Sequence, residues 1–401
     1  MRWIIIVGII MLLLGSCGSQ VAKTSSKPSK VSKVSKPSKT PLKPTKTTAK
    51  QAEKIDLVSI KLPSIKTNDK KAAIGKRLFF DARLSGDGAI SCASCHDPKK
   101  GFADGLVISN AYPGSKGFRN TPTLINTAIK GKLGIPWFHD GRMGTDLNDV
   151  TRDQITETIW MNMDMRIMQE RVKQDPVYVQ MFKDAGMDEP SNGKVRKLIP
   201  EYLKTLTSKN APIDNGKLSE GAKRGLEIFN GKGNCYSCHN GPLFTDGQAH
   251  STGVPENASI YEDPMRHHMM VAFMMFMGIE NYMNVRTDPG FHVVTHNSDM
   301  SDWGKFMTPT LRELKYTAPY MHNGMLATLD DVIDFYNNGG GETANKNPQI
   351  KKLGLSDGEK KDLKDFLLAL SGDPLTGPDY VYSKVIPQKY VPIKDWLTVD
   401  N

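Results

Sequence analysis

The sequence predicts an all-α protein in which two halves follow a similar plan. A Cys-x-x-Cys-His motif occurs twice, beginning at Cys92 and at Cys235. Each motif follows a short segment whose apolar residues have helical spacing, residues 72–80 and residues 222–229. Almost no stretch alternates apolar and polar residues in the way that a half-buried strand does. A helical fold with almost no sheet is therefore expected.

An amphipathic helix is expected to close each half, over residues 193–206 and residues 356–370. The second has the clearer pattern, because Ser356 is a suitable N-cap and Glu359 stands at the capping-box position. The apolar residues on one face of this helix are Leu363, Phe366, Leu367 and Leu370. Such a face is expected to pack against the core.

Each Cys-x-x-Cys-His motif carries the residues that attach a c-type haem. Two thiols add to the vinyl groups of the haem, and the adjacent histidine is placed to ligate the iron. A disulfide, a zinc site or a redox Cys-x-x-Cys pair would not need a histidine directly after the second cysteine in both copies. The sequence therefore predicts two covalent haem c groups, held by Cys92, Cys95, His96, Cys235, Cys238 and His239.

A short basic and apolar helix followed by this motif is typical of the start of a cytochrome c-like domain. We predict two such domains, residues 55–209 and residues 210–376, with a linker near residues 208–216 that contains Asn, Pro and Gly. Residues 377–401 are then a C-terminal extension.

The N-terminus is predicted to be an export signal. Arg2 precedes an apolar run that ends in Leu-Gly-Ser before Cys17. The run is too short to span a bilayer comfortably and ends in small residues, as secretory leaders do. Its end resembles the lipobox of bacterial lipoproteins, which implies lipidation and cleavage at Cys17. The alternative is an uncleaved anchor in which Cys17 has no role.

Residues 18–54 are predicted to be a disordered tether. They consist mainly of Ser, Lys, Pro and Thr and carry a net charge of +9, and they have too little apolar surface to offset the entropy lost on ordering. Either they are a solvated spacer, or they adhere to anionic lipid or wall polymer. Residues 55–401 have no net charge before haem propionates are counted. A nucleic-acid partner is therefore not expected.

Four further stretches resemble the bacterial di-haem cytochrome c peroxidase and MauG family. They are residues 117–124 (GFRNTPTL), 138–142 (FHDGR), 309–314 (PTLREL) and 317–324 (TAPYMHNG). With the two haem motifs, the resemblance covers nearly all of residues 70–372.

The resemblance implies a division of labour between the haems. His96 would be the proximal ligand of a peroxide-reacting haem in the first domain, and His239 that of an electron-transfer haem in the second. It also implies a calcium ion between the haems. The protein ligands of that calcium would be the side chain of Asn120 and the carbonyl oxygens of Thr317 and Pro319, a set that suits a hard cation.

The distal ligand of the second iron separates the family branches. By position after His322, the resemblance assigns it to Tyr336, where cytochrome c peroxidases have methionine and MauG has tyrosine. An anionic oxygen ligand lowers the potential of the iron relative to a thioether. The alternatives are that Tyr336 is only a packed residue at a helix end, or that a methionine is the ligand. The candidate methionines are Met300, Met321 and Met325.

The distal position of the first iron is expected to be free for peroxide. Many family members block it with a histidine on the loop before residue 117, and here the matching residue is Tyr112. The first iron would then be five-coordinate, or loosely blocked by Tyr112.

Peroxide chemistry needs a group that moves a proton as the O–O bond breaks. The family uses a glutamine and, ten positions later, a glutamate. Gln154 and Asp164 have that spacing here, after a five-residue insertion beyond residue 142, and Glu157 is a rival. The alternative is that these are surface residues of a helix.

One departure from the family concerns the electron path between the haems. The family usually has tryptophan directly before Asp-Gly-Arg, and this chain has His139 there, with Trp137 two positions earlier. Imidazole carries an electron hole less well than indole, so transfer is expected to use His139, Trp137 or a direct path.

Residues 264–283 form an insertion with seven methionines and two histidines. Copper binding is one interpretation. Methionine clusters more often fill irregular apolar space, and a lid or a docking surface is the preferred hypothesis.

The expected protein is an exported, lipid-anchored peroxidase on the periplasmic or cell-surface side of a bacterial membrane. It would reduce hydrogen peroxide with electrons from a small cytochrome or copper protein. A MauG-like oxidation of residues on a partner protein and a non-enzymatic electron-transfer cytochrome are the alternatives. The membrane would be reached through the lipid alone, and whether a homodimer forms stays open.

Overall fold

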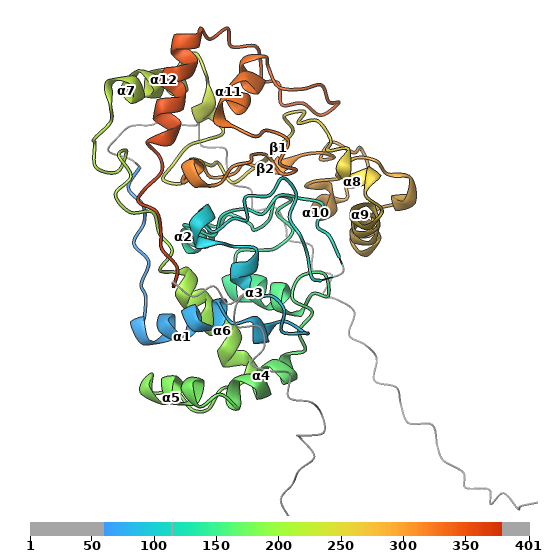
Figure 1. The fold of residues 1–401 in the computed structure, drawn as a ribbon. Helices are drawn as coiled ribbons and strands as arrows, with labels where there is room; N and C mark the ends of the chain where they lie inside the picture. Colours follow the sequence, from blue (N-terminus) through green and yellow to red (C-terminus); the bar gives the residue numbers. More distant parts are fainter. Residues whose placement is uncertain (1–59, 114, 379–401) are drawn as a thin grey trace, which may run out of the picture. The chain divides into compact units, whose positions relative to one another are not determined.

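The computed structural model describes residues 60–113 and 115–378 (Figure 1). The predicted leader, the lipidation site Cys17, the tether and nearly all of the C-terminal extension lie outside the described residues. Among the helices that are described, none is both long and apolar enough to cross a bilayer.

The described chain is mostly helical, which confirms the predicted fold class. The helices in chain order are α1 (Asp69–Phe79), α2 (Thr127–Lys132), α3 (Leu147–Thr156), α4 (Met165–Lys173), α5 (Pro176–Asp184), α6 (Asn192–Leu203), α7 (Glu220–Asn230), α8 (Ser259–Glu262), α9 (Pro264–Phe276), α10 (His292–Thr295), α11 (Leu329–Asn337) and α12 (Asp357–Leu368). Within the described residues, the sheet consists of two short antiparallel strands, β1 (Ala249–His250) and β2 (Phe306–Met307).

The four helices expected from the sequence are α1, α6, α7 and α12. Their N-terminal starts follow local signals. Asn68, Ser191, Ser219 and Ser356 each accept a hydrogen bond from a backbone N–H in the first turn of the helix that follows. The predicted capping box of Ser356 and Glu359 is present.

The two halves repeat one helix pair. α1 packs against α6, and α7 packs against α12 (Figure 1). Each pair crosses at a glycine. A Cβ on Gly75 would lie 1.9 Å from the carbonyl oxygen of Leu198, and one on Gly225 would lie 2.0 Å from that of Asp362. Both helix pairs therefore depend on the absence of a side chain at the crossing.

Each helix pair has its own apolar cluster. The cluster around α1 and α6 is formed by residues between Ile74 and Leu206. That around α7 and α12 is formed by residues between Ala211 and Leu370, together with Ile60. The described residues nevertheless belong to one compact unit, so the domain boundary at residues 209–210 stays a prediction.

The Met-rich insertion contributes to a third apolar cluster. Met270 and Met274 on α9 are fully buried and pack in a cluster that also contains Phe118 from the first half. Phe118 and Phe273 are in ring contact, with their centroids 5.1 Å apart. Part of the insertion thus fills apolar space, while Met275 and Phe276 remain exposed.

Candidate functional site: a shared cavity between two Cys-x-x-Cys-His motifs

Both motifs adopt the same local structure. Each cysteine pair stands on a single 3-10 turn, Cys92–Ser94 in the first and Cys235–Ser237 in the second. The amide of His96 donates to the carbonyl oxygen of Cys92 at 2.9 Å, and that of His239 donates to Cys235 at 2.8 Å. These four cysteines are free thiols. The local fold therefore leaves both thiols of each pair available for covalent attachment.

The histidine of each motif is oriented by a backbone carbonyl. Nδ1 of His96 lies 2.9 Å from the carbonyl oxygen of Phe102, and Nδ1 of His239 lies 2.9 Å from that of Phe244. A carbonyl oxygen only accepts, so Nδ1 carries the proton and Nε2 is left as a neutral donor for a metal. Burial lowers the pKa of both imidazoles, which favours the neutral form that binds iron.

One cavity of about 890 Å³ is lined by both motifs, including His96 and His239. Two unpaired thiol pairs and two histidines with a free Nε2 share this cavity. The residues present therefore fit two haem c groups, which is the donor set that the sequence predicted.

Tyr336 reaches this cavity from α11. Its side chain is half-buried, and burial and the nearby Cys235 raise the pKa of its phenol to about 12. The phenol therefore lies on the side of the second motif. Met321 also lines the cavity, whereas Met300 and Met325 do not. Two candidates for the distal ligand, Tyr336 and Met321, are thus compatible with the cavity.

The three predicted calcium ligands line the same cavity. Asn120 donates its side-chain amide to the carbonyl oxygen of Leu106 at 2.7 Å, which leaves its amide oxygen as the acceptor. The backbone amide of Asn120 donates to the carbonyl oxygen of His322 at 2.7 Å. This bond ties Asn120 to the segment that contains Thr317 and Pro319, both on the cavity wall.

His139 and Trp137 both line the cavity. Nε2 of His139 lies 2.9 Å from the carbonyl oxygen of Asn120, and burial lowers the pKa of this imidazole to about 4. His139 is therefore neutral at physiological pH. The indole of Trp137 is 6% exposed, and its Nε1 has no hydrogen-bond partner in the described chain.

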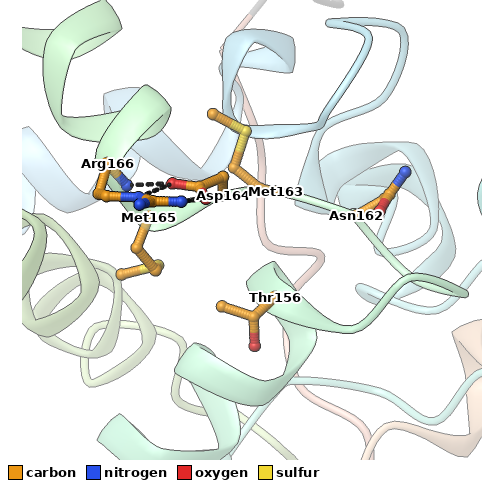
Figure 2. A pocket seen from close by; sticks show the side chains of 6 residues that line it. All are labelled: Thr156, Asn162, Met163, Asp164, Met165 and Arg166. Carbon is orange, nitrogen blue, oxygen red and sulfur yellow. Dashed lines mark hydrogen bonds and ion pairs between the residues drawn. The ribbon is translucent and has the colours of Figure 1, made fainter. Parts of the chain in front are cut away.

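The structure separates the two residues predicted to handle the proton. Gln154, on α3, lines the cavity. Asp164 instead caps α4: its Oδ1 accepts from the amide of Arg166 at 2.7 Å, and its Oδ2 lies 2.6 Å from the Arg166 guanidinium (Figure 2). It lines a different, open pocket. The side-chain and backbone bonds from Arg166 hold the pKa of Asp164 below its usual range. The geometry therefore does not support the pairing of Asp164 with Gln154.

Two other groups from the sequence analysis also lie off the cavity wall. The rival Glu157 is the C-cap of α3 and does not line the cavity, although burial raises its pKa. The hydroxyl of Tyr112 accepts from the amide of Asp87 at 2.8 Å, and Tyr112 does not line the cavity either. The interpretation of Tyr112 as a loose block is therefore not supported by its position.

Sequence reasoning missed a buried ion network beside the cavity. Arg119 pairs with Asp140 at 2.5 Å and with Asp288 at 2.6 Å, and Arg142 pairs with Asp140 at 2.7 Å. Although burial opposes ionisation, the two arginines lower the pKa of Asp140 to about 2. Arg119, Asp140 and Arg142 lie in the motifs at 117–124 and 138–142. Their presence in those motifs was the available signal, whereas Asp288 lies in none.

Comparison with known proteins agrees with this geometry. The family model for di-haem cytochrome c peroxidase matches residues 69–223. The cytochrome-c peroxidase IdrP2 of Denitromonas iodatirespirans is 51% identical over 80% of this chain and 88% of its own length. The methylamine utilization protein MauG of Methylorubrum extorquens is 31% identical over 80% of this chain and 87% of its own length.

Solved structures show the same fold. A crystal structure of a MauG-like protein associated with microbial copper homeostasis is 26% identical and superposes with a TM-score of 0.66. The match covers 80% of this chain and 96% of the other.

Proposed function

The chain belongs to the di-haem cytochrome c peroxidase family, and from this premise we propose that it reduces hydrogen peroxide with electrons from a small cytochrome or copper protein. Peroxide, two protons and two electrons give two water molecules. When bound, the haem irons supply the redox chemistry that breaks the O–O bond. The observation that carries the proposal is the single cavity onto which both motif histidines open.

The protein residues have separable tasks in this proposal. Cys92 and Cys95 hold the first haem, and His96 ligates its iron. The amide of Gln154 on the cavity wall binds or orients peroxide. Gln154 lies 3.3 Å from the carboxylate of Asp153, whose pKa is raised by burial. Asp153 accepts this bond from the Gln154 amide, so it orients Gln154 towards peroxide, a task for which Asp164 is not placed.

The second half serves electron entry in this proposal. Cys235 and Cys238 hold the second haem, His239 ligates its iron, and Tyr336 is the preferred distal ligand. His139 and Trp137 stand on the wall of the shared cavity, where they are candidates for the path between the haems. Two cytochrome c-like domains, residues 55–209 and residues 210–376, would each carry one haem.

We also propose a calcium ion bound by Asn120, Thr317 and Pro319, and export with lipid anchoring at Cys17. The support for calcium is that the amide oxygen of Asn120 is left as an acceptor on the cavity wall. Treatment with a calcium chelator should lower activity, and added calcium should restore it. Labelling with a radioactive fatty acid, compared between the wild type and Cys17→Ser, tests the anchor.

The decisive assay is peroxide-dependent oxidation of reduced cytochrome c by the purified holoprotein. Saturable turnover that is lost in His96→Ala would support the peroxidase. Electron exchange with cytochrome c at a rate that does not depend on peroxide would contradict the peroxidase function and indicate a non-enzymatic electron carrier.

A MauG-like activity is the second candidate, because Tyr336 lies at the cavity on the side of the second motif. Slow turnover with cytochrome c, together with a peroxide-dependent mass change on a co-expressed partner protein, would favour it.

A further inference from the structure

Lys130 is a cation on the cavity wall without an anion. It lies near the C-terminal end of α2 and lines the cavity. Its Nζ lies 5.5 Å from the ring centroid of Trp137. In the described part of the chain, no carboxylate or other acceptor bonds to this ammonium group. Burial alone lowers the pKa of Lys130 to about 8.

The arginines that line the cavity are all paired. Arg119 bonds to Asp140 and Asp288, and Arg142 bonds to Asp140. Arg312 bonds to Asp214 at 2.7 Å. Lys130 is thus unlike these arginines, and its lack of a counter-charge calls for an explanation.

A second unpartnered donor lies beside Lys130. The indole of Trp137 is more than nine-tenths buried, and its Nε1 bonds to nothing in the described chain. Buried N–H groups in native proteins nearly always have an acceptor, because leaving one unpaired costs its full desolvation energy. A charged donor and a neutral donor are therefore held together on one wall, and both lack acceptors.

A carboxylate matches this pair of donors. It can accept from an ammonium group and from an indole N–H at once, and its charge balances the lysine. A haem c attached through its vinyl groups keeps two free propionate carboxylates, which would lie within this cavity.

We infer that Lys130 and Trp137 form the binding site for a propionate of one of the two haems. The inference rests on the haem content of the proposed function. Lys130 is then a positioning residue: it anchors the haem at its polar edge, while the thioether bonds anchor it at the other. Its positive charge also favours the reduced, less positive state of the iron.

The test compares Lys130→Met with Lys130→Arg and with Trp137→Phe, all as holoproteins. Lys132→Met is the matched control, because Lys132 is on the same helix, is exposed, and donates to the carbonyl oxygen of Ser64 away from the cavity. Haem content is measured by the pyridine haemochrome method, and midpoint potentials by spectroelectrochemical titration.

We expect Lys130→Met to shift one midpoint potential to a lower value. Lys130→Arg should remain near the wild type, Trp137→Phe should shift the same potential by less, and Lys132→Met should shift neither. Loss of haem in Lys130→Met that Lys130→Arg restores would also support a charge-dependent site.

Three results would overturn the inference. One is full haem content in Lys130→Met with both potentials unchanged. Another is an equal loss of haem in Lys130→Met and Lys130→Arg, which would show that haem binding depends on the shape of the lysine side chain and not on its charge. The third concerns the wild type at constant ionic strength, where a midpoint potential would depend on the concentration of chloride or phosphate. If the potentials of Lys130→Met did not depend on these anions, the site would be assigned to a free anion. Wild-type peroxidase activity is measured in parallel, so a failure here leaves the proposed function intact.

Discussion

At the scale of single residues, the structure separates Gln154 from Asp164, although their spacing suggested a catalytic pair. Gln154 lines the cavity, and Asp164 caps α4 in a different pocket. The spacing was transferred across a five-residue insertion after residue 142, and such an insertion can change which residues face inward. The direction of a side chain depends on the helix that carries it, which a count along the chain does not capture.

We predict that Gln154→Ala lowers kcat/KM for peroxide by roughly 10²-fold, because a group that orients peroxide is lost. Steady-state oxidation of reduced cytochrome c at varied peroxide measures this. Asp164→Asn is the matched control, since asparagine keeps the oxygen that caps α4, and its kcat/KM should stay near that of the wild type. An equal loss in both variants would show that Asp164 acts in catalysis after all.

At the scale of elements, the repeated helix pair was only partly visible in the sequence. Helical spacing identified α1, α6, α7 and α12, and the capping box identified the start of α12. That α1 crosses α6 in the way that α7 crosses α12 could not be predicted, because it depends on contacts between distant segments. Gly75 and Gly225 are the residues that permit both crossings.

We predict that Gly75→Ala and Gly225→Ala each destabilise the protein by about 1–3 kcal/mol, because the new Cβ would overlap a backbone carbonyl oxygen of the facing helix. Urea unfolding of the holoprotein measures the loss. Gly193→Ala in α6 and Gly358→Ala in α12 are matched controls, since a Cβ there meets nothing within 4 Å. Both controls should be neutral or stabilising. Equal destabilisation at all four glycines would contradict the close-crossing explanation.

At the scale of the whole molecule, a buried ion network joins the two halves. Arg119 from the first half bridges Asp140 of the same half and Asp288 of the second. Removing one partner leaves buried charges uncompensated. The network lies beside the cavity, so it also fixes the wall on which His139 and Arg142 stand.

We predict that Arg119→Met destabilises the protein by about 3–5 kcal/mol, because it leaves Asp288 without a cation and Asp140 with Arg142 alone. Arg166→Met, which breaks only the exposed pair with Asp164, is the control and should have little effect. Urea unfolding at neutral pH measures both. Similar stability of the two variants would show that the network contributes nothing.

The network also predicts a pH dependence. The pKa of Asp140 in the folded state is lowered to about 2, below the value of about 3.9 in an unfolded chain. Its contribution to stability is therefore present above about pH 4 and is lost as the pH falls towards about 2. Between these pH values, the wild type should lose more stability than Arg119→Met. Parallel acid-unfolding curves for the two proteins would contradict this.

The sequence alone predicted the helical fold and the six Cys and His residues of the two motifs, which the structure places on one cavity. They could be predicted because covalent haem attachment needs a fixed local pattern. The sequence also predicted residues that the structure places on one cavity wall, including Asn120, His139 and Tyr336. It could not indicate Lys130, since a lysine in a short helix has no distinctive pattern. The importance of Lys130 arises from its place beside Trp137 and from the lack of an acid near it.

The most direct test of the division of labour between the haems is low-temperature EPR of the ferric holoprotein, for the wild type and Tyr336→Phe, with Met321→Leu as the control. We expect a high-spin signal from an open iron on His96 and a low-spin signal from the iron on His239. Tyr336→Phe should alter only the low-spin signal, and Met321→Leu should alter neither. Two low-spin signals that Tyr336→Phe leaves unchanged would contradict both the open first iron and the assignment of Tyr336 as ligand of the second.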